Sequence, residues 1–281
     1  MKELKIFGVV TFFTLVLYWS VEPYAHSILH PHVAEADFEF KDLEEVTAKG
    51  DVAQGKDLVT TNCTACHGIK SQGIGNPLDN ATANMSYGIV PPDLSTAGKI
   101  YDEKFLANFI KDPANATKTA HKFVEGKTHP MPSYGWMSDS DIASMVAYLK
   151  SIAPAEMTNE EIFVDACGRC HDMKYSKNFA TSDVSEYMGS TPPDLSMMIR
   201  SRGFEHLTIF VNDPQKHLPG TAMPRVGLNE ASQEQVITYI EEIGDSKKAE
   251  REALAPYVLG FLAFMTFISF LWKKEIWSEV K

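Results

Sequence analysis

The sequence predicts a mainly α-helical protein in which two tandem domains of one plan lie between two apolar helices. Three observations lead to this fold class. A five-residue motif with two cysteines occurs twice and uses all four cysteines of the 281-residue chain. The elements downstream of each copy recur in the same order, and an apolar segment lies near each terminus. A period near one hundred residues indicates tandem domains rather than a solenoid of short repeats.

Composition narrows the class of protein. With 44% hydrophobic residues the chain is neither disordered nor a polytopic membrane protein. Its formal net charge of −11 argues against a nucleic-acid partner, because a phosphate backbone attracts a basic surface. An acidic surface suits a basic protein partner, although it also serves solubility alone.

The repeated motif is Cys63-Thr64-Ala65-Cys66-His67 and then Cys167-Gly168-Arg169-Cys170-His171. This is the attachment pattern of c-type haem, in which the cysteines bond to the vinyl groups and the histidine binds iron. We therefore expect two covalent haem c groups on two tandem class I cytochrome c-like domains, and no catalytic residues. A structural zinc or a redox dithiol would leave the histidine after each second cysteine unexplained. Covalent attachment takes place outside the bacterial cytoplasm, so the domains are expected in the periplasm.

Residues 1–24 form the expected N-terminal membrane anchor or uncleaved signal. An apolar run extends from Ile6 to Val21, which suits either a secretory signal or a short span. The first A-x-A pattern after this run, Ala34-Glu35-Ala36, lies well beyond the end of the run and favours a retained anchor. Residues 25–50 are acidic and are expected to be a linker that can drape over a partner.

The first domain is expected at residues 51–153. A short helix leads into the first motif, and a helix that follows the Pro91-Pro92-Asp93-Leu94-Ser95 segment stops at Asp112-Pro113. The loop around Met131 comes next, and Ser138-x-x-Asp141 is a capping-box signal for a closing helix.

The second domain is expected at residues 154–245 and repeats this order. Pro192-Pro193-Asp194-Leu195-Ser196 corresponds to the first proline pair, and Ala222-Met223-Pro224 corresponds to the first methionine loop. The offset between the copies falls from 104 residues at the cysteines to 92 at the methionines, so the second copy has shorter loops. The connection is short and contains Pro154, so the domains are expected to touch.

Residues 246–281 form the expected C-terminal anchor. The stretch from Leu254 to Trp272 is almost wholly apolar, is long enough to span a bilayer, and is followed by Lys273 and Lys274. Lysines thus flank the outer end of each apolar segment. By the positive-inside tendency, both termini face the cytoplasm of a bacterial inner membrane and the haem domains lie on the periplasmic side.

Each iron needs a second axial ligand to pass electrons without binding substrate. Met131 and Met223 are the best candidates, because each precedes a proline at the same place in its copy and a thioether raises the potential. Met137 is the rival for the first haem, and packing methionines are the alternative for both. The histidines outside the motifs are weaker candidates: His121, His129, His206 and His217.

The proline pairs, including Pro92 and Pro193, are expected to form part of the wall against each haem. Arg200 and Arg202 follow the second pair closely enough to reach haem propionates, which a guanidinium can bind with two hydrogen bonds. A solvated helix face is the alternative for these arginines.

The stretch PPDLSMMIRSRGFEH resembles cytochrome c1, the haem c subunit of the quinol:cytochrome c oxidoreductase (cytochrome bc1) complex. The resemblance implies that His171 and Met223 are axial ligands of the second haem and that Arg202 is a propionate partner. The c1 family typically has one haem and a cleaved signal. Two short modules and a retained anchor look like the dihaem variant found in some bacteria.

The resemblance further implies a non-catalytic electron-transfer subunit. It would accept electrons from a Rieske iron-sulfur protein, beside cytochrome b in a dimeric complex, and reduce a soluble cytochrome c or a terminal oxidase. A dihaem subunit of a haem-copper (cbb3-type) oxidase shares the tandem modules but is usually anchored from its N-terminal side only. A dihaem peroxidase needs one iron with an open site, against which the matched methionines argue. A free-standing membrane-tied electron shuttle is the remaining alternative.

Overall fold

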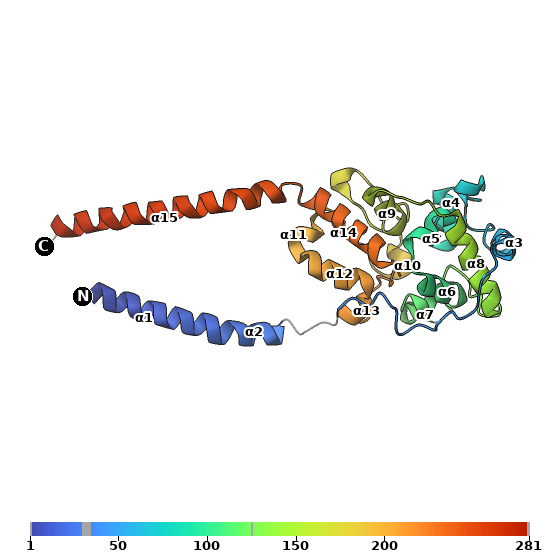
Figure 1. Ribbon diagram of the computed structural model, residues 1–281, viewed down its shortest axis with the longest axis horizontal. Coiled ribbons are helices and arrows are strands. Elements are labelled where there is room, and N and C mark those ends of the chain that lie inside the picture. Colours follow the sequence, from blue (N-terminus) through green and yellow to red (C-terminus); the bar gives the residue numbers. More distant parts are fainter. Residues whose placement is uncertain (1, 30–34, 125, 280–281) are drawn as a thin grey trace.

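The computed structural model describes residues 2–29, 35–124 and 126–279, so Ala34 of the A-x-A pattern lies outside the described residues. Within these ranges the chain is helical, and its β-type pairings are isolated bridges. Figure 1 shows a body of short helices and two long terminal helices that leave it on the same side. The mainly helical class expected from the sequence is confirmed.

The first module, residues 51–153, is built around the crossing of its first and last helices. A Cβ atom on Gly55 would lie 1.9 Å from the carbonyl oxygen of Ser144, so only glycine permits this close approach. Asp51 and Ser138 cap the two helices by accepting from the backbone N–H of Gln54 and Asp141. The elements are α3 (Val52–Asn62), η2 (Lys70–Gln72), α4 (Asn80–Tyr87), η3 (Leu94–Thr96), α5 (Ala97–Ile100), α6 (Glu103–Lys111), α7 (Pro113–Ala116), η4 (Ala120–Lys122) and α8 (Asp139–Ile152).

The second module, residues 154–245, has a similar order of elements. Thr158 and Glu161 form the capping box that begins its first helix, and Pro214 opens a short helix directly after Asp213, as Pro113 does after Asp112. The elements are α9 (Asn159–Ala166), η5 (Lys174–Ser176), α10 (Ser185–Met188), η6 (Leu195–Met197), α11 (Met198–Arg202), α12 (Phe204–Asn212), α13 (Pro214–His217) and α14 (Glu230–Gly244).

Each module has a hydrophobic core, but the two cores differ in where their residues come from. The core of the first module is drawn from residues 46–152, mainly from α3, α6 and α8. The core of the second module packs α9 against α14 and also includes Ile100 from the first module, whose side chain is 1% exposed. The second core is therefore completed by its neighbour.

The modules touch along a seam of hydrogen bonds, as the short connection between them predicts. The backbone N–H of Asn229 donates to the carbonyl of Ile100 at 3.1 Å, and Thr96 Oγ1 donates to the carboxylate of Asp165 at 2.7 Å. The N–H of Val90 donates to Ser182 Oγ at 2.9 Å in a buried setting. Buried hydrogen bonds favour one relative placement, because losing a partner leaves a desolvated group.

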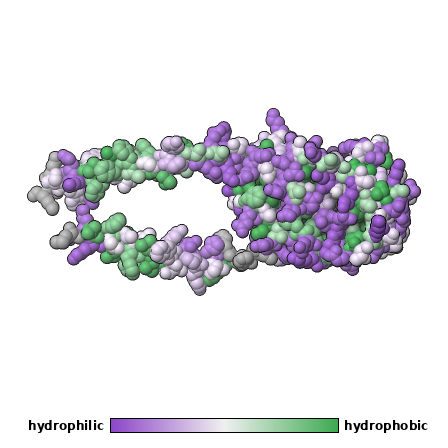
Figure 2. All heavy atoms as spheres, viewed as in Figure 1, coloured by the Kyte–Doolittle hydropathy of each residue, from purple (hydrophilic) through white to green (hydrophobic). Residues whose placement is uncertain are grey.

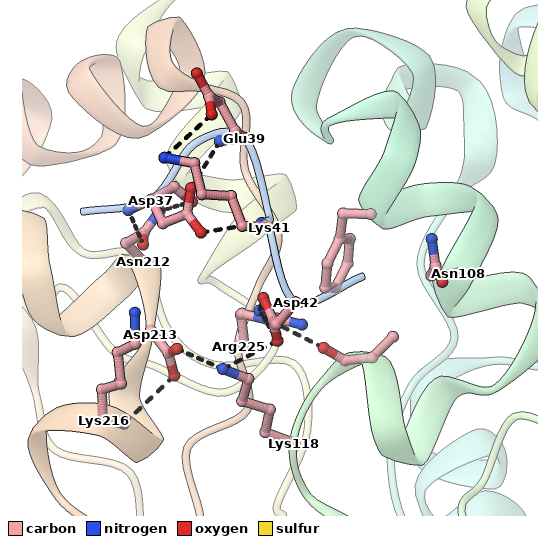
Figure 3. A network of polar contacts seen from close by, with 12 residues as sticks. Asp37, Glu39, Lys41, Asp42, Asn108, Lys118, Asn212, Asp213, Lys216 and Arg225 are labelled. Carbon is pink, nitrogen blue, oxygen red and sulfur yellow. Dashed lines mark hydrogen bonds and ion pairs between the residues drawn. The ribbon is translucent and has the colours of Figure 1, made fainter. Parts of the chain in front are cut away.

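Residues 37–45, which we call the strap, lie across both modules (Figure 3). Nη1 of Arg225 donates to both carboxylate oxygens of Asp42, at 2.7 and 2.9 Å, and Lys118 bridges Asp42 at 3.2 Å and Asp213 at 2.6 Å. Phe40 of the strap is 1% exposed and packs on Phe105. The strap, which is part of the acidic linker, thus lies on the chain's own modules, whereas the sequence suggested that the linker could drape over a partner.

The terminal helices are exposed and apolar. Near the N-terminus, α1 (Lys2–Val16), η1 (Leu17–Val21) and α2 (Glu22–Leu29) follow one another, and α15 (Lys248–Glu279) follows the second module. The stretches Lys2–Leu29 and Lys248–Ser278 are long and apolar enough to cross a membrane, although a secretory signal meets the same test. Figure 2 shows apolar residues gathered on these helices and polar ones over the body.

Candidate functional site

The two cysteine motifs fold into the same turn. The first cysteine of each motif ends a helix, and its carbonyl accepts from the N–H groups of the second cysteine and the histidine. These distances are 3.1 and 2.9 Å at Cys63, and 3.1 and 3.0 Å at Cys167. All four cysteines are free thiols. Burial raises the pKa of Cys63 to about 11 and the pKa of Cys167 to about 12, so both are neutral thiols at pH 7.

Both motif histidines are held by the same kind of contact. His67 Nδ1 lies 2.8 Å from the carbonyl oxygen of Pro92, and His171 Nδ1 lies 2.8 Å from that of Pro193. A carbonyl can only accept, so Nδ1 carries the proton and Nε2 keeps its lone pair. Burial lowers the pKa of each histidine, which favours the neutral ring. Each imidazole is oriented as a ligand through Nε2.

The proline segments that hold the histidines are themselves fixed by repeated hydrogen bonds. Leu94 and Leu195 donate from their backbone N–H to carbonyls directly after the motifs, at 2.9 Å in both modules. The serine hydroxyls of both segments accept from backbone N–H groups of η2 and η5. The aspartate carboxylates accept from the backbone N–H groups of the same serines. These contacts are Ser71 N to Ser95 Oγ at 3.0 Å, Tyr175 N to Ser196 Oγ at 3.1 Å, Ser95 N to Asp93 at 2.9 Å, and Ser196 N to Asp194 at 3.1 Å.

Each predicted methionine ligand packs against the same hydrophobic core as the first cysteine of its module. Met131 lies against the first core together with Cys63, and Met223 lies against the second core, which contains Cys167. The backbone N–H of Met131 donates to His129 Nδ1 at 3.1 Å, which orders this loop. Met137, the rival for the first haem, is a buried member of the first core. Met131 and Met223 as iron ligands stay a prediction, because sharing a core does not by itself place their sulfur atoms next to the motifs.

The remaining candidate residues contact other parts of the chain. Arg200 Nε is 4.0 Å from Asp245, at the junction with α15, and the side chain is about half exposed. Arg202 lies near His206, whose pKa is lowered by burial, by His217 and by Arg202. His121 Nε2 lies 3.3 Å from the carbonyl of Thr221. The expected propionate role of Arg200 and Arg202 stays a prediction.

Two arginines that the sequence reasoning did not single out are important in the fold. Arg225 is 2% exposed, pairs with Asp42, and donates from Nε to the carbonyl of Ala116 at 3.0 Å. Arg169 is the third residue of the second motif, and its Nε is buried without a hydrogen-bond partner. Its position inside the motif, where the first copy has Ala65, was the available signal.

The chemistry of these residues fits haem c. Two free thiols per module can form thioethers, each histidine presents an unprotonated Nε2, and a soft methionine sulfur lies in the same core. In the described residues no cluster of three or more His, Cys, Asp or Glu side chains suits a bare metal ion. The donor set therefore fits haem better than zinc.

Comparison with known proteins identifies the class of the first module. Residues 52–153 match the family model of cytochrome c. The cytochrome c of Tetrahymena pyriformis is 28% identical over 116 residues, which cover 40% of this chain and 98% of that protein. Cytochrome c2 of Pararhodospirillum photometricum is 26% identical over 113 residues, covering 37% and 98%. The first module is thus a cytochrome c domain, a class in which covalently bound haem c carries electrons.

One solved structure aligns along nearly the whole chain. It is described as a hyperthermophilic respiratory Complex III, with 15% sequence identity, a TM-score of 0.33 and coverage of 99% of this chain and 98% of that one.

Proposed function

We propose that this chain is a membrane-anchored dihaem cytochrome c that transfers electrons one at a time through both modules. The contact from a motif histidine Nδ1 to a proline carbonyl supports this proposal most directly. It occurs at 2.8 Å both in the module that matches the cytochrome c family and in the second module. A fold that prepares two histidines in the same way prepares two equivalent sites.

The protein's own residues attach, orient and bury the cofactor, while a bound haem supplies the one-electron iron chemistry. Cys63 and Cys66 would hold the first haem, and Cys167 and Cys170 the second. Nε2 of each motif histidine and the sulfur atoms of Met131 and Met223 would bind the irons. The proline carbonyls keep the proton on Nδ1 and strengthen the imidazole as a ligand.

Within this function, we assign the chain the role of the cytochrome c1-like subunit of a quinol:cytochrome c oxidoreductase. It would accept electrons from a Rieske iron-sulfur protein and pass them to a soluble cytochrome c or terminal oxidase. The PPDLS stretch followed by paired arginines and the apolar α15 support this assignment. Lysines at the outer ends of both apolar segments support an orientation with the modules on the periplasmic side.

Counting haems tests the two-site proposal. We expect a pyridine haemochrome assay to return two haems per chain. The matched variants Cys63→Ala/Cys66→Ala and Cys167→Ala/Cys170→Ala should each return one. A wild-type value of one would contradict the second site.

Matched methionine variants test the ligands. A thioether favours ferrous iron, so Met131→Ala and Met223→Ala should each lower a different midpoint potential, by about 59 mV or more for a tenfold change in a one-electron couple. Met137→Ala is the control and should leave both unchanged. An unchanged titration for Met131→Ala would favour Met137 as the ligand.

Purification from detergent-solubilised membranes tests the assignment to a complex. We expect a cytochrome b and an iron-sulfur protein to copurify with the chain. Recovery with a copper-containing oxidase would contradict the cytochrome c1-like role and leave the dihaem cytochrome standing.

A further inference from the structure

Arg169 is a charge that only one of the two attachment motifs carries. The equivalent position in the first motif is Ala65, which is exposed. Arg169 is partly buried at the seam, and its Nε has no hydrogen-bond partner. A buried donor without an acceptor costs about 1–3 kcal/mol, and more when charged, so its placement calls for a partner.

The backbone of Arg169 is tied to the first module through the seam. Its carbonyl accepts from the N–H of Ser182 at 2.9 Å, and Ser182 Oγ accepts from the N–H of Val90 at 2.9 Å. Val90 lies two residues before Pro92, whose carbonyl orients His67. A short chain of contacts therefore joins the second motif to the histidine of the first.

The charge of Arg169 reaches several groups at the seam. The pKa of His67 is lowered mainly by burial, and Arg169 lowers it further. Tyr101 is buried, which raises its pKa, while Arg169 lowers that pKa. Burial raises the pKa of Asp165 and Arg169 acts against that shift, while Thr96 Oγ1 donates to the same carboxylate. The Arg169 side chain also forms a hydrogen bond with Tyr101 of the first module, while its Nε keeps no partner.

We propose that Arg169 is a cross-module tuning residue. Carried by the second motif, it holds a positive charge, and an N–H donor for a haem propionate, beside the haem of the first motif, and so raises that haem's reduction potential. Reduction adds one electron to the haem, and a nearby fixed cation favours the more negative state. The inference rests on the proposed dihaem function.

The test compares variants of the full-length, haem-loaded chain in detergent by spectroelectrochemical titration. The variants Met131→His and Met223→His show which midpoint potential belongs to which haem. Each replaces a thioether by a nitrogen ligand, which lowers the potential of the haem in its own module. Arg169→Gln should make reduction of the first haem about tenfold less favourable, or about 59 mV lower for a one-electron couple. Arg169→Lys keeps the charge. The equilibrium constant for reduction of its first haem should stay within about threefold of the wild-type value, which corresponds to about 30 mV.

Ala65→Arg is the matched control, because it places the same residue at the same motif position on an exposed surface. It should change the equilibrium constant for reduction of the second haem by less than about twofold. An unchanged first potential in Arg169→Gln, or a shift confined to the second haem, would overturn the inference while leaving two counted haems in place. One haem in the wild type would instead overturn the proposed function.

Asp165→Asn provides a second variant if Arg169→Gln does not incorporate haem. It removes a negative charge from the same seam and keeps an acceptor for Thr96. The first potential should rise, and an unchanged or lower value would contradict electrostatic tuning across the seam.

Discussion

The two modules share their histidine contacts but differ in how they are completed. The first core uses residues 46–152, whereas the second core borrows Ile100 from the first module. Residues 52–153, which lie in the first module, match the cytochrome c family. The difference shows that the same local histidine contacts can occur in two differently packed surroundings.

Separating the modules should have the largest effect. A fragment of residues 35–153 is expected to incorporate haem and unfold cooperatively, because its core and the strap residue Phe40 are both retained. A fragment of residues 154–245 lacks Ile100 and is expected not to unfold cooperatively. Circular dichroism during heating measures both. Cooperative unfolding of the second fragment would show that the borrowed packing is dispensable.

Truncating the borrowed side chain should have the next largest effect. Ile100→Ala removes a side chain that is 1% exposed and should lower the free energy of unfolding by about 2–5 kcal/mol. Ile142→Ala, also fully buried but confined to the first core, is the matched control. Denaturant titration of the fragment 35–153 separates the two variants. Ile142→Ala should destabilise this fragment, while Ile100→Ala should affect it less than it affects the full chain.

Breaking the strap should have a smaller, pH-dependent effect. Asp42→Asn leaves the buried Arg225 without its counter-ion and should cost about 1–3 kcal/mol at pH 7. Burial opposes ionisation of Asp42, but hydrogen bonds and charge from Arg225 and Lys118 outweigh it and hold its pKa below the ordinary 3.8. The stabilisation is therefore present above pH 3.8 and is lost as pH falls through the lower folded-state pKa.

Denaturant titrations of wild type and Asp42→Asn at several pH values measure this contribution. The difference between the two proteins should be constant near neutrality and should shrink below the unfolded-state pKa. A difference that grows on acidification would contradict the assignment. Glu39→Gln, at an exposed ion pair of the same strap, is the control and should change stability by less than about 1 kcal/mol.

The smallest expected effect tests the likeness of the modules. Ser95→Ala and Ser196→Ala each remove a hydroxyl that accepts from the backbone near the attachment motif. Each should cost about 0.5–1.5 kcal/mol, and the two costs should agree. Thermal unfolding of the full chain measures both. Unequal costs would show that the repeated contacts do not carry equal weight in the two modules.

Local patterns in the sequence predicted much of the site but little of its long-range support. The helix cap at Ser138 and the helix end at Asp112-Pro113 depend on neighbouring residues, so the sequence alone predicted them. The pair of Asp42 and Arg225 joins residues 183 positions apart, and no periodicity reports such a contact. Pro92 and Pro193 were expected as wall residues, and their carbonyl role became visible only in three dimensions.

The two modules lie at different distances from the terminal helices (Figure 1). In Figure 1 the helices α11, α12 and α14 of the second module lie toward the terminal helices, and α3 and α8 of the first module lie at the far end. Asp245, directly after α14, forms a two-pronged ion pair with Arg251 of α15 at 2.6 and 2.8 Å, which stiffens this junction. On the proposed function, the second haem is the membrane-proximal station and the first reaches outward, so the long axis of the body sets how far from the bilayer an electron is delivered.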